Sequence, residues 1–156
     1  MAEPEETGLR ELRRYGRDEL EALYAREREL SVPEGLFRGV FLGWIDMPLW
    51  RHPFARFTEH LGFRLTPFGV DFDRRLWFFW RPALALGRFT PEIGPSRWRE
   101  ARTVRLRYEP SRLPRPVRGL LYDEVKPLSR NVCLGLGGIN APRGWGDHFY
   151  FALVRS

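Results

Sequence analysis

The sequence has little of the residue types that build disulfides and metal centres. Cys133 is the only cysteine, which excludes an intramolecular disulfide and a cysteine-rich zinc site. The three histidines, His52, His60 and His148, lack the spacing of metal-binding pairs. We therefore predict neither a bound metal nor a cofactor.

Long apolar runs are also missing. The most apolar stretch, residues 76–86, is interrupted by arginine and proline, and it falls short of the roughly 20 apolar residues that a membrane-spanning helix needs. The first six residues are polar and acidic, unlike a secretory signal. These features predict a soluble, cytoplasmic protein without a membrane span.

Lysine is nearly absent, because Lys126 is the single lysine among 26 basic residues. The net charge of +6 is uneven: residues 1–31 hold 9 acids and 6 arginines, whereas residues 32–156 hold 11 acids and 20 basic residues. A basic body could meet nucleic acid, anionic lipid or an acidic ligand. The arginines alternate with apolar residues and do not cluster, so we regard nucleic acid as a disfavoured partner.

Helical spacing is confined to the N-terminal segment, where leucines recur three or four residues apart among charged residues. Asp18 is a candidate N-cap, and Gly16 is placed to kink or divide the segment. We predict that residues 1–31 form one or two amphipathic helices. These helices would pack on a β-domain formed by residues 32–156.

Beyond residue 32, short runs of β-branched and aromatic residues are separated by glycine, proline or aspartate. In the clearest of these runs, Val104, Leu106 and Tyr108 share one face and two arginines share the other. About eight strands without intervening helices favour an antiparallel barrel or sandwich. The predicted strands are residues 35–45, 62–68, 73–80, 83–89, 103–108, 117–125, 132–139 and 148–154.

Aromatic residues make up 15% of the chain, and many fall in strands that are apolar on both faces, as in residues 76–80 and 149–154. Such strands must be covered on both sides. A barrel whose outside is covered by the N-terminal helices, or by a second subunit in a homodimer, satisfies this requirement. A two-layer sandwich is the alternative. We favour the barrel because about eight strands can enclose one small ligand.

Gly135, Gly137 and Gly138 lie in one predicted strand. A glycine-rich loop that binds phosphate needs a following helix, and none is predicted here. Glycines within a strand more often permit bending or the close approach of a neighbouring group.

Four segments resemble uncharacterised bacterial proteins of the GXWXG type, which have small lipocalin-like barrels. They are residues 32–39 (VPEGLFRG), 121–125 (LYDEV), 134–138 (LGLGG) and 149–155 (FYFALVR). Phe37 stands where that family has its name-giving tryptophan. The resemblance implies a lipocalin-like barrel of about eight strands behind an N-terminal helix. It implies no established activity.

The aromatic excess and the expected barrel predict a cavity that binds a small apolar or amphipathic molecule, including an anionic one. Arg64 and Arg105 are candidates for the mouth of this cavity, and Asp123, Glu124 and His148 for a polar site within it. Strand alternation sends Asp123 and Glu124 to opposite faces. The candidate aromatic ligand-binding residues are Phe37, Trp44, Phe63, Trp77, Phe79, Tyr122, Phe149 and Phe151.

Non-catalytic binding is the favoured function. The first alternative is an enzyme that uses an interior carboxylate or histidine on a hydrophobic substrate. The second is a nucleic-acid or protein interaction module based on the positive charge of residues 32–156.

Overall fold

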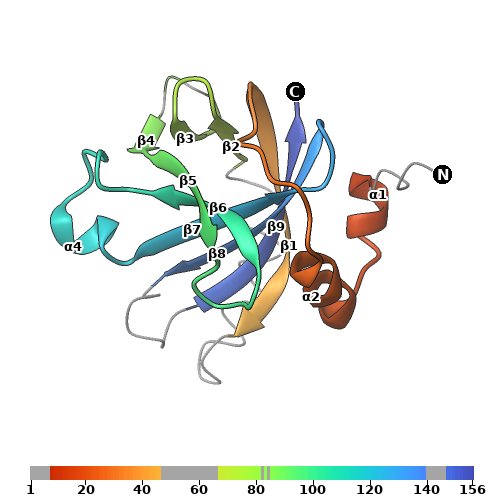
Figure 1. Cartoon of the computed structure of the whole chain (residues 1–156). Coiled ribbons are helices and arrows are strands. Elements are labelled where there is room, and N and C mark those ends of the chain that lie inside the picture. Colours follow the sequence, from red (N-terminus) through yellow and green to blue (C-terminus); the bar gives the residue numbers. More distant parts are fainter. Residues whose placement is uncertain (1–7, 47–66, 82, 84, 140–146) are drawn as a thin grey trace.

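The computed structural model describes residues 8–46, 67–81, 83, 85–139 and 147–156. The helical spacing near the N-terminus produces two short helices, α1 (Leu9–Leu12) and α2 (Arg17–Ala25) (Figure 1). Gly16 separates them and is itself the N-cap of α2. Asp18 is therefore not the N-cap. It lies in the first turn, where the positive end of the helix dipole stabilises its negative charge.

Nine strands are described, and each is antiparallel to its neighbours. They are β1 (Leu36–Asp46), β2 (Phe68–Asp71), β3 (Leu76–Phe79), β4 (Ala85–Arg88), β5 (Thr90–Pro95), β6 (Arg102–Arg107), β7 (Leu121–Pro127), β8 (Val132–Ile139) and β9 (Asp147–Arg155).

The strand order is β4-β3-β2-β1-β9-β8-β7-β6-β5, which places β4 and β5 at the two ends of the sheet. Phe89 alone separates these two strands along the chain, so the ends of the sheet meet and the barrel is nearly closed (Figure 1). The predicted fold class, a mainly β antiparallel barrel with short N-terminal helices, is confirmed.

Two elements differ from the sequence pattern. The pattern does not predict β5, because Pro91 and Pro95 lack the N–H group that a central strand needs. An edge strand tolerates proline, since half of its backbone groups have no strand partner. The predicted strand 117–125 starts only at Leu121, because the preceding residues form the short helix α4 (Arg115–Arg118). Most of the predicted strand 62–68 lies outside the described residues.

The two faces of the strands contribute to two separate apolar clusters. The inner cluster fills much of the barrel and consists of Phe37, Val70, Phe72, Phe89, Val104, Leu106, Tyr108, Val125, Cys133, Phe151 and Leu153. The outer cluster packs the two helices against the outside of the barrel and consists of Leu12, Leu20, Leu23, Tyr24, Ile45, Leu128, Val132, Leu134, Leu136, Tyr150 and Ala152. Strand β9, which is apolar on both faces, is thus covered on both sides. No residue of β3 is in the outer cluster, and Trp80 at its end is 57% exposed.

An irregularity in β1 changes which of its residues face inward. Phe41 pairs with Phe151, but the next registered pair is Gly43 with Tyr150, so one residue of β1 has no partner. This bulge shifts the alternation by one position. Phe37, before the bulge, belongs to the inner cluster, and Trp44, after it, also faces the interior although its number has the opposite parity.

Candidate functional site

A cavity of about 240 Å³ lies inside the barrel beside the inner cluster. Its described lining is apolar apart from one carboxyl, one phenol and two indole N–H groups. Strands β1, β2, β3, β6, β7, β8 and β9 all contribute to it. The lining residues are Trp44, Phe68, Val70, Trp77, Phe79, Leu106, Tyr108, Leu121, Asp123, Gly138, Phe149 and Phe151. Five of the aromatic candidates from the sequence, Trp44, Trp77, Phe79, Phe149 and Phe151, are in this set.

Ring-to-ring contacts hold the cavity wall in place. Trp44 meets Phe149 edge-on with 5.5 Å between ring centroids, and Phe149 lies 6.0 Å from Phe151. Phe68 meets Phe151 edge-on at 5.9 Å, which extends the wall from β9 to β2. Trp77 contacts Phe79 in the same way at 5.3 Å. Edge-to-face pairs of this kind are worth about 0.5–1.5 kcal/mol each beyond the area they bury.

The polar pair of the cavity is Tyr108, which directly follows β6, and Asp123 of the neighbouring strand β7. The Tyr108 hydroxyl donates a hydrogen bond to the Asp123 carboxylate. Burial raises the pKa of Asp123 from 3.8 to about 6. Gly137, opposite on β8, leaves room for this carboxylate, because a Cβ atom there would lie 2.5 Å from Asp123 Oδ1.

Two further polar atoms, in lining residues, have no partner among the described residues. The indole N–H groups of Trp44 and Trp77 are buried, and neither finds an acceptor within the described part of the chain. A buried N–H donor without an acceptor costs about 1–3 kcal/mol. An acceptor on a bound molecule would recover that free energy.

Glu124 lies on the opposite face of β7 from Asp123 and does not reach the cavity. Its side chain is fully buried beneath α2 and accepts hydrogen bonds from the hydroxyls of Tyr24, Ser96 and Tyr122 and from the backbone N–H of Arg97. The Tyr24 contact measures 2.7 Å. These four donors satisfy the buried carboxylate, so Glu124 holds the N-terminal helix to the barrel.

Lys126 is two residues further along the same face of β7 and makes a second contact between the barrel and α2. Its ammonium group donates to the carbonyls of Tyr24 and Arg26 at the C-terminal end of α2. A positive charge there is favoured by the helix dipole and by the unpaired carbonyls of the last turn. Arg99 adds a bidentate ion pair with Glu21 of α2, with N–O distances of 2.6 and 2.5 Å.

Three other candidates lie away from the cavity lining. Phe37 is buried in the inner cluster, where it packs edge-on against Phe72 at 5.5 Å. Arg105 and Tyr122 point to the outer face of β6 and β7, so Arg105 does not stand at the cavity mouth. Strand alternation accounts for both, because their neighbours Leu106, Leu121 and Asp123 face inward.

The remaining candidates cannot be placed. Phe63 and Arg64 lie outside the described residues. The backbone of His148 pairs with Asp46 and Gly138, but its side chain is also outside what the structure describes. A carboxylate–imidazole pair therefore stays a prediction. Cys133 is fully buried in the inner cluster, and burial raises the pKa of its thiol to about 12, which suits a structural role.

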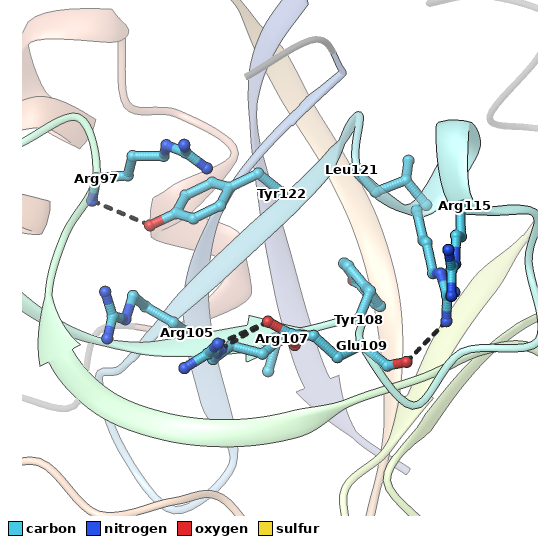
Figure 2. Close-up of a pocket in the computed structure, with 11 residues that line it drawn as sticks. Arg97, Arg105, Arg107, Tyr108, Glu109, Arg115, Leu121 and Tyr122 are labelled. Atoms are coloured by element: carbon cyan, nitrogen blue, oxygen red, sulfur yellow. Dashed lines mark hydrogen bonds and ion pairs between the residues drawn. The ribbon is translucent and has the colours of Figure 1, made fainter. Parts of the chain in front are cut away.

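Arg105 and Tyr122 instead line a second hollow, a groove of about 570 Å³ on the outside of β6 and β7. Figure 2 shows Arg97 beside the Tyr122 ring, Arg105 and Arg107 along β6, and Arg115 of α4 on the far side. The guanidinium carbon of Arg97 lies 5.2 Å from the centre of that ring. The sequence pattern did not predict this gathering of arginines, because they come from three separate segments: the loop at Arg97, strand β6 and helix α4.

Tyr108, Leu106 and Leu121 line the cavity but were not among the candidates. The alternation of residues 103–108 puts Tyr108 on the same face as Val104 and Leu106, and this pattern alone could have indicated that Tyr108 faces the interior. Its pairing with Asp123 depends on the register of β6 against β7, and that register cannot be read from either strand alone.

No protein-family model matches the chain, and no curated protein matches it. Among solved structures, the chain is similar to the crystal structure of a protein from Thermomonospora curvata, with a TM-score of 0.51 and 19% sequence identity. The similarity covers 91% of this chain and 88% of that chain. Likeness at this identity shows the barrel fold alone. Membership of the GXWXG family is not established.

Two other kinds of feature are absent from the described residues. No helix in that part of the chain is long and apolar enough to cross a membrane. Within the same residues, no group of three or more histidine, cysteine or acidic side chains is arranged to hold a metal ion.

Proposed function

We propose that the barrel binds a small, mostly apolar molecule that carries a hydrogen-bond acceptor. The observation that carries this proposal is the aromatic cavity lined by Trp44 and Trp77, whose buried indole N–H groups have no acceptor among the described residues. An apolar cavity of about 150 Å³ takes up benzene. At about 240 Å³, this cavity suits a body of roughly two rings or a short branched chain.

The acceptor requirement distinguishes this site from a simple packing defect. A wholly apolar guest would gain contact with the rings but would leave both indole donors unpaired. A carbonyl or ether on the guest would pair one of them, and a net hydrogen bond is worth about 1 kcal/mol, or roughly fivefold in affinity. The site should therefore prefer a ketone to a hydrocarbon of equal size.

Isothermal titration calorimetry with 2-acetylnaphthalene and 2-ethylnaphthalene tests this preference. We expect the ketone to bind about fivefold more tightly, and we expect Trp44→Phe and Trp77→Phe together to abolish the difference. Trp98→Phe is the matched control, because Trp98 lies outside the cavity against Tyr122. Val70→Phe, which fills the cavity, should prevent binding of both compounds. Binding that survives Val70→Phe in a folded protein would overturn the proposal.

Acid–base catalysis on the bound molecule is the second candidate, and the Tyr108–Asp123 pair is the observation that favours it. A carboxyl with a pKa near 6 exchanges protons readily at neutral pH. Native mass spectrometry of the freshly purified protein would identify a bound molecule. If that molecule is converted on incubation and Asp123→Asn stops the conversion without preventing binding, the protein is an enzyme. A molecule that stays unchanged supports binding alone.

A further inference from the structure

The arginine-lined groove lies where β6 and β7 separate. The two strands are paired from Val104 with Val125 to Leu106 with Asp123. Beyond that point β6 continues to Arg107 and β7 begins at Leu121, but no strand pairing joins them. The chain between the two strands passes through α4, which places Arg115 and Arg118 along the groove (Figure 2).

The positive charge of this groove is only partly neutralised. Five arginines line it, against one described carboxylate, that of Glu109. Arg105 and Arg107 form ion pairs with Glu92 at 2.8 and 3.0 Å, and Arg107 also pairs with Glu109.

Three donor groups of the groove have no carboxylate or other acceptor in the part of the chain that the structure describes. Within the described residues, the guanidinium groups of Arg97 and Arg115 make no ion pair with a carboxylate. The Nε atom of Arg105 is buried and finds no acceptor there. Arginine groups in this state favour a carboxylate or phosphate, because charge-assisted hydrogen bonds are about twice as strong as neutral ones.

The groove and the barrel cavity share part of their walls. Leu106, Tyr108 and Leu121 line both spaces, so these three residues form the partition between them. A charged group held by the arginines would thus lie on one side of an apolar partition, with the aromatic cavity on the other. This arrangement suits a molecule with an anionic head and an apolar body.

We propose that the groove binds the carboxylate or phosphate of an amphipathic molecule whose apolar body enters the cavity past Leu106, Tyr108 and Leu121. The proposal rests on the proposed binding function and adds the charge of the ligand and the position of its head. It predicts that affinity depends on the arginines for charged ligands only. A neutral ligand with the same apolar body should bind without regard to them.

Octanol, octanoate and octyl phosphate test this proposal, because they share one apolar chain and differ in the head. By calorimetry at low salt, we expect both anions to bind about tenfold more tightly than octanol, and we expect 0.5 M sodium chloride to reduce that advantage. The double variant Arg97→Gln/Arg115→Gln should remove the advantage and leave octanol binding unchanged. Arg102→Gln is the matched control, an exposed arginine on β6 outside the groove.

The outcomes separate this inference from the function on which it rests. If octanol binds and neither anion binds more tightly, the groove proposal is wrong and the cavity function stands. If octanol fails to bind while the anions bind through the arginines, the cavity function is wrong, and the groove is a simple anion site. Inorganic phosphate that binds as tightly as octyl phosphate would also overturn the amphipathic proposal. A preference for phosphate over carboxylate, with both above octanol, would identify the head.

Discussion

Titration of the Asp123 carboxyl should lower the free energy of unfolding as the pH is raised from about 4 to about 6. Its pKa is about 6 in the folded protein, because burial disfavours the charged form, against 3.8 ordinarily. Between these values the unfolded chain has released a proton that the folded chain still holds. Raising the pH therefore favours the unfolded state. A difference of about two pH units corresponds to about 3 kcal/mol.

Asp123→Asn isolates this effect, because asparagine keeps a carbonyl that can accept the Tyr108 hydrogen bond but has no proton to lose. Urea unfolding of both proteins, followed by circular dichroism at pH values from 3.5 to 8, gives the free energy of unfolding of each. We expect the wild type to lose about 3 kcal/mol relative to the variant across this range. Acids that do not interact with Asp123 titrate alike in both proteins, so their contributions cancel in the difference.

Glu109→Gln is a control of opposite sign. Its hydrogen bond to Arg107 lowers the pKa of Glu109, so that carboxylate stabilises the folded state above its unfolded pKa and the contribution is lost on acidification. The effect should be small, because Glu109 is exposed. A free-energy difference between wild type and Asp123→Asn that stays constant from pH 3.5 to 8 would refute the burial of a titrating carboxyl in the cavity.

Two further substitutions test the packing around the site. Tyr24→Phe removes one donor from the buried Glu124 carboxylate and should lower the free energy of unfolding by about 1.5–3 kcal/mol in urea titrations. Tyr15→Phe is the control and should cost far less, because Tyr15 is only partly buried against the outer cluster and is not among the donors to Glu124. Equal losses would contradict this role. Gly137→Ala places a methyl group 2.5 Å from a carboxylate oxygen and should cost about 1–3 kcal/mol in thermal or urea unfolding. Gly43→Ala is the control and should be nearly neutral, because no atom lies within 4 Å of the added Cβ. A larger loss of stability at position 43 than at position 137 would contradict the close packing of Gly137 against Asp123.

The sequence predicted the fold well where local pattern decides the structure. The alternation in β6 and the apolar character of both faces of β9 are properties of single segments, and both segments are strands in the structure. β5 is different, because its prolines argue against a strand unless its position at the sheet edge is known. That position depends on the whole strand order, which no local pattern contains.

The candidate site was predicted less completely, for two physical reasons. Trp44 faces the cavity through a bulge in β1, and the existence of that bulge depends on the pairing of β1 with β9. Arg105 was assigned to the cavity mouth from its residue type, although alternation sends it outward with Tyr122. Side chains that meet from separate strands, as Tyr108 and Asp123 do, require the register before their chemistry can be inferred.

The position of Lys126 gives the protein a built-in chemical reporter. The other basic side chains of the sequence are guanidinium and imidazole groups, so Lys126 carries the only side-chain primary amine. It is 1% exposed and is covered by the end of α2. Acylating reagents can modify this amine only when the helix leaves the barrel. The rate of acylation at this residue therefore measures how often the N-terminal helix detaches, without any label added to the chain.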